Sequence, residues 1–357
     1  MPLDQHINRA IRRSRAFCRA ATPGHFLISA WFPVPAPAVP PLYQCPLEML
    51  GNLERYVHHL FEAARPGFAA KDGLDDDSIP SVCPRFGIAE HAAWLGMDVR
   101  LQENTCLPTP IIHGPDDLKR IRLSVDDRWF GYMQRGYQSL QSLAQGLCVL
   151  SVRGTLSPME LANLARGDDL FTDFVDDPPF VHRLLDKLTD AIAWYFDHLV
   201  SWTDELSGGH VFMYGSLWLP SRTIGHLSND AAMLCGPQVY REFGFPYEQR
   251  LVRRYDHCFY HVHNEKLHFL RDLVKLPDLL FVEVTNDPRS PRVVDDLDRV
   301  LWATEPANLM IQLTSDELRQ HVGQLKCRNV VLNVQCRDRA DAQDAVRLVR
   351  SESKPLE

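Results

Sequence analysis

The sequence lacks any long apolar stretch. No uninterrupted apolar run approaches the roughly 18 residues of a membrane-spanning helix, and the N-terminus has no apolar segment of a secretory signal. A disulfide framework is lacking too, because the nine cysteines are odd in number and scattered along the chain. These absences predict a cytoplasmic, reducing setting with free thiols and no membrane partner.

An excess of positive charge is also lacking. The 357 residues carry a formal net charge of −8, which argues against a nucleic-acid partner. The one basic stretch, Arg9–Arg19, is interpreted as the solvated face of a helix over residues 1–20. The aspartate-rich stretch 71–79 lacks the spacing and closing glutamate of a calcium loop, so it is interpreted as a solvated turn.

Short apolar runs that alternate with helix-like stretches are the main pattern present. Strands that alternate with helices predict a parallel sheet. Eight such units in one chain of this length predict the α/β class and a single (β/α)₈ TIM barrel. The predicted strands are Phe26–Phe32, Ser81–Phe86, Leu147–Val152, His210–Tyr214, His257–His263, Leu279–Val284, Leu309–Leu313 and Asn329–Cys336.

The barrel is expected to carry an N-terminal extension. Residues 1–46 are predicted to form a helix followed by a Pro-rich rim segment, and residues 47–357 are predicted to form the barrel. Because six prolines fall within residues 33–46, that segment is excluded from helix and is expected to extend over the barrel mouth. The sequence contains no internal repeat, and Ser315 is a candidate N-cap of one of the later helices.

Metal-binding residue types lie at the ends of three predicted strands. The fifth run ends in His261 and His263, the sixth ends near Glu283, and the eighth ends in Cys336. Barrel active sites lie at the C-terminal strand ends, and alternate residues of a strand share one face. Imidazole and thiolate suit zinc, and three protein ligands leave a position open for substrate. The pattern therefore predicts zinc held by His261, His263 and Cys336. Glu283 would serve as a fourth ligand, a partner of a ligand or a general base; mutual hydrogen bonding of these polar residues without metal is the alternative.

Other residues near the predicted mouth are candidates for substrate binding. Arg153 follows the third strand and is expected to hold an anionic group through two hydrogen bonds, with a structural ion pair as the alternative. Tyr214 and Trp218 are expected to wall the pocket, with core packing as the alternative. Either Asn333 or Gln335 on the eighth strand is expected to face the substrate, and Asn333 is taken as the candidate.

Four segments in the same order resemble the uroporphyrinogen decarboxylase superfamily. The similarity covers most of residues 80–350 and implies a (β/α)₈ barrel, in agreement with the strand count. The segments are Ala93–Val99 (AWLGMDV), Pro110–Leu118, Arg153–Val181 with its Arg-Gly-Thr-Leu-Ser-Pro start, and Leu227–Tyr247 with Leu-Ser-Asn-Asp and Val-Tyr-Arg-Glu-Phe.

The resemblance implies one of two chemistries. True uroporphyrinogen decarboxylases rely on an aspartate whose position falls on Gly87 here, so porphyrinogen decarboxylation is not expected. The other branch consists of zinc-dependent methyltransferases that pass a methyl group between a corrinoid protein and a thiol. Their His-x-Cys motif and distal cysteine match at His261 and Cys336, whereas His263 replaces the middle cysteine.

These expectations combine into a functional hypothesis. The chain is expected to be a zinc-dependent methyltransferase-like enzyme that moves a methyl group between a corrinoid or small methyl donor and a thiol-type acceptor. A small-molecule substrate and a corrinoid protein would be its partners. One alternative is a cofactor-independent lyase or decarboxylase, in which Arg153 holds a carboxylate and His261 or Glu283 moves a proton. The other is a non-catalytic binding protein of the same fold.

Overall fold

The computed structural model describes residues 3–44, 50–102, 105–265, 267–286 and 291–356. Its α-helices are α1 (Leu3–Arg19), α2 (Leu50–Ala70), α3 (Arg128–Ala144), α4 (Pro158–Arg166), α5 (Asp169–Asp176), α6 (Pro178–Ser201), α7 (Asp230–Leu234), α8 (Pro237–Val239), α9 (Phe245–Val252), α10 (Leu270–Leu273), α11 (Leu297–Ala303), α12 (Ser315–Leu325) and α13 (Arg339–Glu352). Its strands are β1 (Phe26–Trp31), β2 (Ser81–Val82), β3 (Val99–Leu101), β4 (Cys106–Pro108), β5 (Val149–Leu150), β6 (Gly209–Phe212), β7 (Leu217–Pro220), β8 (Thr223–Ser228), β9 (His257–His263), β10 (Leu279–Thr285), β11 (Leu309–Thr314) and β12 (Val330–Gln335). Short 3₁₀ turns are η1 (Leu42–Gln44), η2 (Ala89–His91), η3 (Ala93–Leu95), η4 (Pro115–Arg120), η5 (Tyr214–Ser216) and η7 (Val293–Asp296), and a π-helical turn, η6 (Tyr240–Gly244), leads into α9.

The centre of the molecule is a parallel sheet. Six strands pair in the order β1-β12-β11-β10-β9-β8. Two of the predicted strands, β2 and β5, form a separate parallel pair, and β6 pairs with β7 in an antiparallel hairpin. The predicted α/β class is therefore confirmed, and among the described residues the strand ladders form four separate sheets.

One strand of the central sheet was not predicted. Residues 217–220 follow the predicted strand His210–Tyr214 and form the unpredicted strand β7, which folds back on β6. The next strand, β8, pairs with β9 and is buried along its whole length. Glycine and histidine interrupt its apolar residues, so β8 lacks the continuous apolar run by which the other buried strands are recognised.

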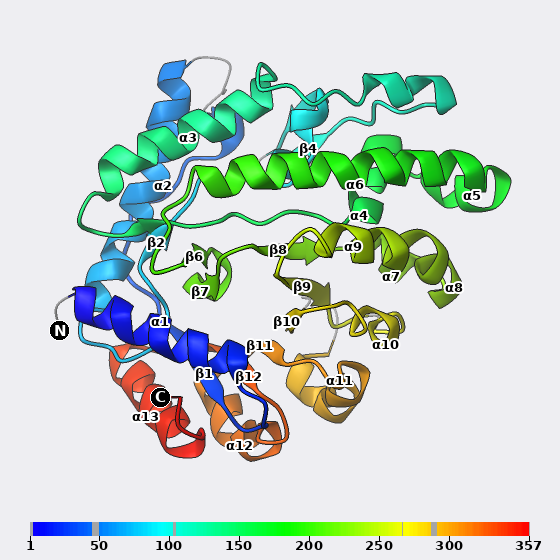
Figure 1. Cartoon of the computed structure of the whole chain (residues 1–357). Helices are drawn as coiled ribbons and strands as arrows, with labels where there is room; N and C mark the ends of the chain where they lie inside the picture. Colours follow the sequence, from blue (N-terminus) through cyan, green and yellow to red (C-terminus); the bar gives the residue numbers. More distant parts are fainter. Residues whose placement is uncertain (1–2, 45–49, 103–104, 266, 287–290, 357) are drawn as a thin grey trace.

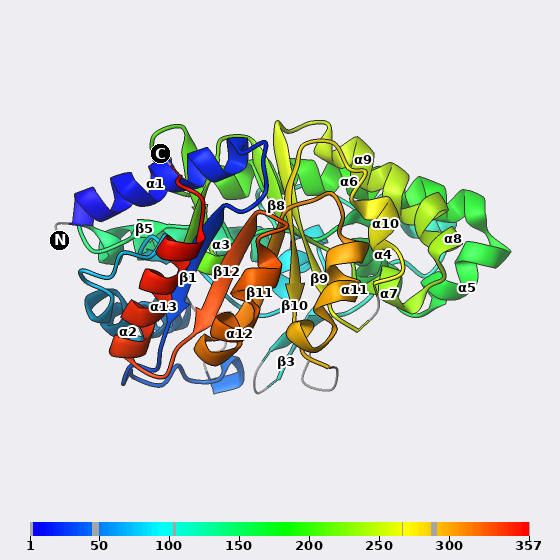
Figure 2. The same cartoon turned by 90° about the horizontal axis from the view of Figure 1, so that it is seen from below.

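Helices cover the strands on two sides. Figure 1 shows α3 and α6 on one side of the strands and α12 and α13 on the opposite side. Figure 2 shows α11, α12 and α13 side by side, and α1 lying across the edge at which β1 begins. Helix α12 begins with a capping box in which Thr314 is the N-cap, one residue before the predicted Ser315. No helix within the described ranges combines the length and apolarity needed to cross a bilayer.

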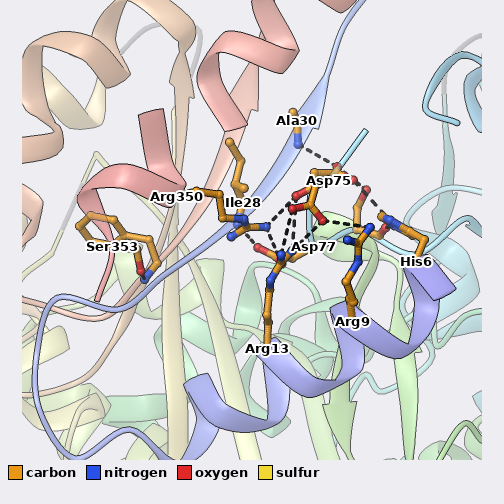
Figure 3. A network of polar contacts seen from close by, with 12 residues as sticks. His6, Arg9, Arg13, Ile28, Ala30, Asp75, Asp77, Arg350 and Ser353 are labelled. Atoms are coloured by element: carbon orange, nitrogen blue, oxygen red, sulfur yellow. Dashed lines mark hydrogen bonds and ion pairs between the residues drawn. The ribbon is translucent and has the colours of Figure 1, made fainter. Parts of the chain in front are cut away.

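The basic face of α1 packs against the acidic segment, which corrects the solvated interpretation of both stretches. Arg13 Nη2 lies 2.9 Å from Asp75 Oδ2, and Arg13 Nη1 lies 3.3 Å from Asp77 Oδ1. Arg350 of α13 lies 2.8 Å from the same Asp77 oxygen (Figure 3). Asp76 is 1% exposed and Asp77 is fully buried. The arginines and aspartates therefore fix α1 and α13 to the sheet.

These aspartates also complete the edge of the sheet. β1 is the edge strand, so its outward N–H groups need partners other than a neighbouring ladder. Asp77 Oδ2 accepts from Ile28 N at 2.8 Å, and Asp76 Oδ2 accepts from Ala30 N at 3.2 Å. Burial raises the pKa of Asp77 although Arg350 and Arg13 lie beside it. The carboxylates thus occupy the position that another strand would take.

Candidate metal centre

Side chains from three neighbouring strands converge at one point. His226 lies on β8, His261 on β9 and Glu283 on β10, and their ligand atoms all lie within 4.8 Å of one another. His226 Nε2 and His261 Nδ1 each lie 2.8 Å from the same Glu283 oxygen, Oε2. Within the described ranges, this is the group of His, Cys, Asp or Glu side chains placed to share a metal ion.

Local sequence explains how β8 presents His226. The ladder between β8 and β9 is irregular around this residue, while Glu283 and His261 are in register between β9 and β10. Gly154 has φ +93°, and a Cβ there would lie 2.8 Å from the backbone nitrogen of His226. A Cβ on Gly225 would lie 2.2 Å from the ring of Phe259. Glycine is therefore needed at both positions for the chain to approach His226 this closely.

Two members of the cluster, Glu283 and His226, are held in the protonation states that metal ligands require. Burial alone would raise the pKa of Glu283, but hydrogen bonds from His226 and His261 outweigh it and hold the pKa well below its usual range. Burial, reinforced by the nearby His261, lowers the pKa of His226 to about 3. At neutral pH the cluster therefore contains a carboxylate and a neutral imidazole, the forms that bind metal ions.

A second set of contacts supports His226 from behind. The Tyr214 ring stacks on the imidazole, with 3.4 Å between ring centroids and 4° between planes. The Tyr214 hydroxyl accepts a hydrogen bond from Arg153 Nη1, and Arg153 Nε donates to the buried carboxylate of Glu90. The ion pair that the sequence analysis gives as the alternative for Arg153 is present, and its contact with substrate stays a prediction.

Two predicted zinc ligands lie outside the converging group. His263 has its ring 4.9 Å from that of His261, but its Nε2 lies 3.7 Å from Asp230 Oδ1. Cys336 is 2% exposed, and burial raises its pKa to about 12. Cys336 lies just after the end of β12, is not among the residues that line the cavity with Asn333, and does not belong to the converging group. The structure thus brings His261 and Glu283 together in the converging group, to which His263, although its ring lies near that of His261, and Cys336 do not belong.

The remaining predicted pocket residues are divided. Trp218 is 1% exposed and packs in a small hydrophobic cluster with Ala10 and Ile11 of α1. Its Nε1 donates to Leu206 O at 2.7 Å, as expected for the core-packing alternative. Asn333 instead lines a cavity of about 350 Å³. This cavity is formed mainly by β1, β11, β12 and η5; its lining includes Ser29, Trp31, Ser216, Gln312, Asn333 and Gln335.

Several residues that line the cavity are close in sequence to the residues of the His226–His261–Glu283 cluster. Gly215 and Ser216, which line it, directly follow Tyr214, whose ring stacks on His226. Asn286, also in the lining, follows the strand that carries Glu283. Short segments of chain therefore connect the cavity to the residues of the cluster.

His226 and Glu90 were not predicted from the sequence. His226 directly precedes the Leu-Ser-Asn-Asp segment and lies on β8, a strand that the apolar pattern does not reveal. Glu90 carries a weak signal, because a carboxylate within the apolar stretch 86–97 needs a partner if it is buried. Its partner, Arg153, lies 63 residues away in the sequence, so the pair could not be inferred from spacing.

The donor atoms define what the site can bind. Two imidazole nitrogens and one carboxylate oxygen form a donor set typical of catalytic zinc, with a further position open. Comparison with known proteins gives no match to any family model and none to a curated protein. The resemblance therefore stays a prediction, and function has to be argued from the site.

Proposed function

We propose that this protein is an enzyme that binds one divalent metal ion through His226, His261 and Glu283. The supporting observation is that two imidazole nitrogens converge on one carboxylate oxygen at 2.8 Å each. The donor set fits zinc and also fits non-haem iron(II). When bound, the metal would act as a Lewis acid on an oxygen of the substrate.

The chain's own residues would orient the ligands. Tyr214 stacks on His226 and restricts the plane of its ring, and Arg153 holds the Tyr214 hydroxyl. Glu90 neutralises Arg153, so this support adds no net charge beside the ligands. The substrate would occupy the adjoining cavity of about 350 Å³.

The narrower methyltransferase hypothesis rests on the sequence resemblance and on His261. Thiol-activating zinc of that kind would draw on Cys336, which is buried just after β12 and does not belong to the converging group. The cofactor-independent lyase has its own supporting observation, because His226, Glu283 and His261 are hydrogen-bonded to one another without a metal. Such a triad can hold and move a proton.

We also infer that the separate sheets are parts of a distorted (β/α)₈ barrel. Asp77 N donates to Ile28 O at 2.7 Å, which links the segment before β2 to β1. A parallel bridge joins Val152, just after β5, to Phe212 of β6. These single contacts follow the order in which barrel strands would succeed one another.

Metal binding provides the direct test. The purified protein is analysed for metals, stripped with EDTA, and titrated with Zn²⁺ or, anaerobically, with Fe²⁺ in a calorimeter. The wild type should bind one ion per chain. His226→Ala and Glu283→Gln should lower the affinity at least 100-fold, because each removes a ligand. His257→Ala, at the opposite end of the strand that carries His261, is the matched histidine control and should bind like the wild type.

The same titration distinguishes the alternatives. Cys336→Ala should retain full metal content under the proposed ligand set. Loss of metal in Cys336→Ala with retention in His226→Ala would instead support the ligand set predicted from the sequence. If the wild type binds neither ion, the metal proposal is refuted and the metal-free lyase is favoured.

A further inference from the structure

The cavity of about 350 Å³ is lined in part by neutral side chains that can form hydrogen bonds. The side-chain amides of Gln312, Asn333 and Gln335 line it, and each amide offers two donors and an acceptor. Within the described part of the chain, none of these amides has a hydrogen-bond partner, and neither does the hydroxyl of Ser29. A ligand that supplies both donors and acceptors would complete them.

Strand register brings these groups together. In the ladders between β1, β12 and β11, Ser29 is opposite Asn333, and Asn333 is opposite Gln312. Trp31 is opposite Gln335, one step further along the same face. Because neighbouring strands lie about 5 Å apart, one small molecule can contact side chains from all three strands.

The positive charges of the lining already have partners. Lys71 Nζ lies 3.0 Å from the buried carboxylate of Asp76. Arg292 forms a two-pronged ion pair with Glu317, in which Nη2 donates to Oε2 at 2.8 Å. Among the described lining residues, the lysine and the arginine are therefore both paired, which disfavours an anionic ligand.

Trp31 adds an apolar surface to this polar wall. Its side chain is 44% exposed and lines the cavity beside the amides. An aromatic ring next to neutral amides suits a molecule with an apolar C–H face and a rim of hydroxyl groups. The volume of about 350 Å³ lies at the lower end of ligand sites, roughly 300–1,000 Å³.

We propose that the cavity binds a neutral polyhydroxylated molecule, a sugar or a cyclic polyol. Trp31 lies against its apolar face, and Gln312, Asn333 and Gln335 bind its hydroxyl groups. The inference rests on the proposed function only in making this ligand the substrate. Binding itself needs no metal, so it can be tested on the metal-free protein.

The test uses EDTA-treated protein and a fixed set of probes. Glucose, galactose, xylose and myo-inositol are examined by saturation-transfer NMR, and any binder is titrated by calorimetry; benzoate is the anion without hydroxyls. At least one neutral probe should bind, and benzoate should not. Asn333→Leu and Gln312→Met remove an amide at nearly constant volume, and each should weaken binding at least tenfold. Gln138→Met, on the exposed face of α3, is the control and should leave binding unchanged.

The outcomes separate this proposal from the metal site. Failure of all four neutral probes, preferential binding of benzoate, or full affinity in both amide variants and in Trp31→Ala overturns it. His226→Ala should bind the probe like the wild type in EDTA while it loses Zn²⁺ binding. A protein that binds the probe but no metal supports the cavity assignment and refutes the metal assignment.

Discussion

Glu160 on α4 gives a quantitative test of how the fold buries charge. It is 9% exposed, and its Oε2 accepts a hydrogen bond from Ala231 N at 2.7 Å. Burial, with a further contribution from Asp230, raises the pKa of Glu160 from 4.5 to about 7. Between these two values the native carboxyl keeps a proton that the unfolded chain has released.

The sign and size of the effect follow from this difference. Because the native state binds more protons, the free energy of unfolding falls as the pH rises through the interval. The favourable contribution is fully present below pH 4.5 and is lost as the pH passes about 7. At about 1.4 kcal/mol per pH unit, the interval corresponds to roughly 3 kcal/mol.

Glu160→Gln removes this titration and keeps an oxygen for the Ala231 N–H. The variant should match the wild type near pH 4 and exceed its stability by roughly 3 kcal/mol above pH 8. Urea unfolding at intervals from pH 4 to 9 measures the difference, in which other buried carboxylates cancel. Glu54→Gln, on the exposed face of α2, is the control and should show no such trend. A stability difference that stays constant with pH would refute the reasoning.

Three further predictions concern the ionic network, the site and the thiols. Asp77→Ala should lower the free energy of unfolding by about 3–5 kcal/mol, because it leaves Arg13 and Arg350 without the buried carboxylate. Asp75 is only half-buried, so Asp75→Ala should lower it by less than about 1 kcal/mol. Urea unfolding measures both losses, and equal losses would contradict the burial argument. Gly154→Ala should weaken Zn²⁺ binding at least tenfold by calorimetry, since its Cβ would lie 2.8 Å from a ligand's backbone nitrogen; unchanged affinity would count against the metal site. Iodoacetamide at pH 8 should alkylate the exposed Cys327 well before Cys336, whose pKa burial raises to about 12; peptide mass spectrometry follows both, and equal rates would show that the thiol is accessible.

The fold could be predicted where burial leaves a continuous apolar run. Each of the eight runs overlaps a strand, and the predicted runs 257–263 and 279–284 closely match β9 and β10 of the central sheet. β8 could not be found in this way, because Gly225 and His226 occupy places where close packing requires a small residue or a polar contact. The unpredicted strand β7, which pairs with β6, directly precedes β8 and made β8 harder to recognise in the sequence.

The charged stretches show a second limit of the sequence. Arg9–Arg19 and the segment 71–79 each resemble a solvated surface when considered alone. Arg13 and Asp77 are 64 residues apart, and only the packing of α1 across the edge of the sheet brings them together. Burial then depends on the pairing, which local composition does not contain.

Cys336 illustrates a constraint that the sequence did contain. Residues three apart on a strand point to opposite faces, so within the predicted strand Asn329–Cys336 the side chains of Asn333 and Cys336 would not be expected on the same face. Asn333 and Gln335 both line the cavity, so their side of β12 is the side that faces it. Cys336 is 2% exposed and lies just after β12, and its role as a zinc ligand stays a prediction.

The geometry of parallel strands explains why the candidate ligands come one from each strand. Alternate residues of a strand share a face but lie about 7 Å apart along it, whereas residues in register on neighbouring strands lie about 5 Å apart. His261 and His263 satisfy the first relation, and His261 and Glu283 satisfy the second. A single ion needs ligand atoms closer than either backbone spacing, and side chains on adjacent strands can lean toward one another to meet this need. His226, His261 and Glu283, on β8, β9 and β10, have that arrangement. The His-x-His pattern places His261 in this group, and the zinc ligands expected from the sequence stay a prediction.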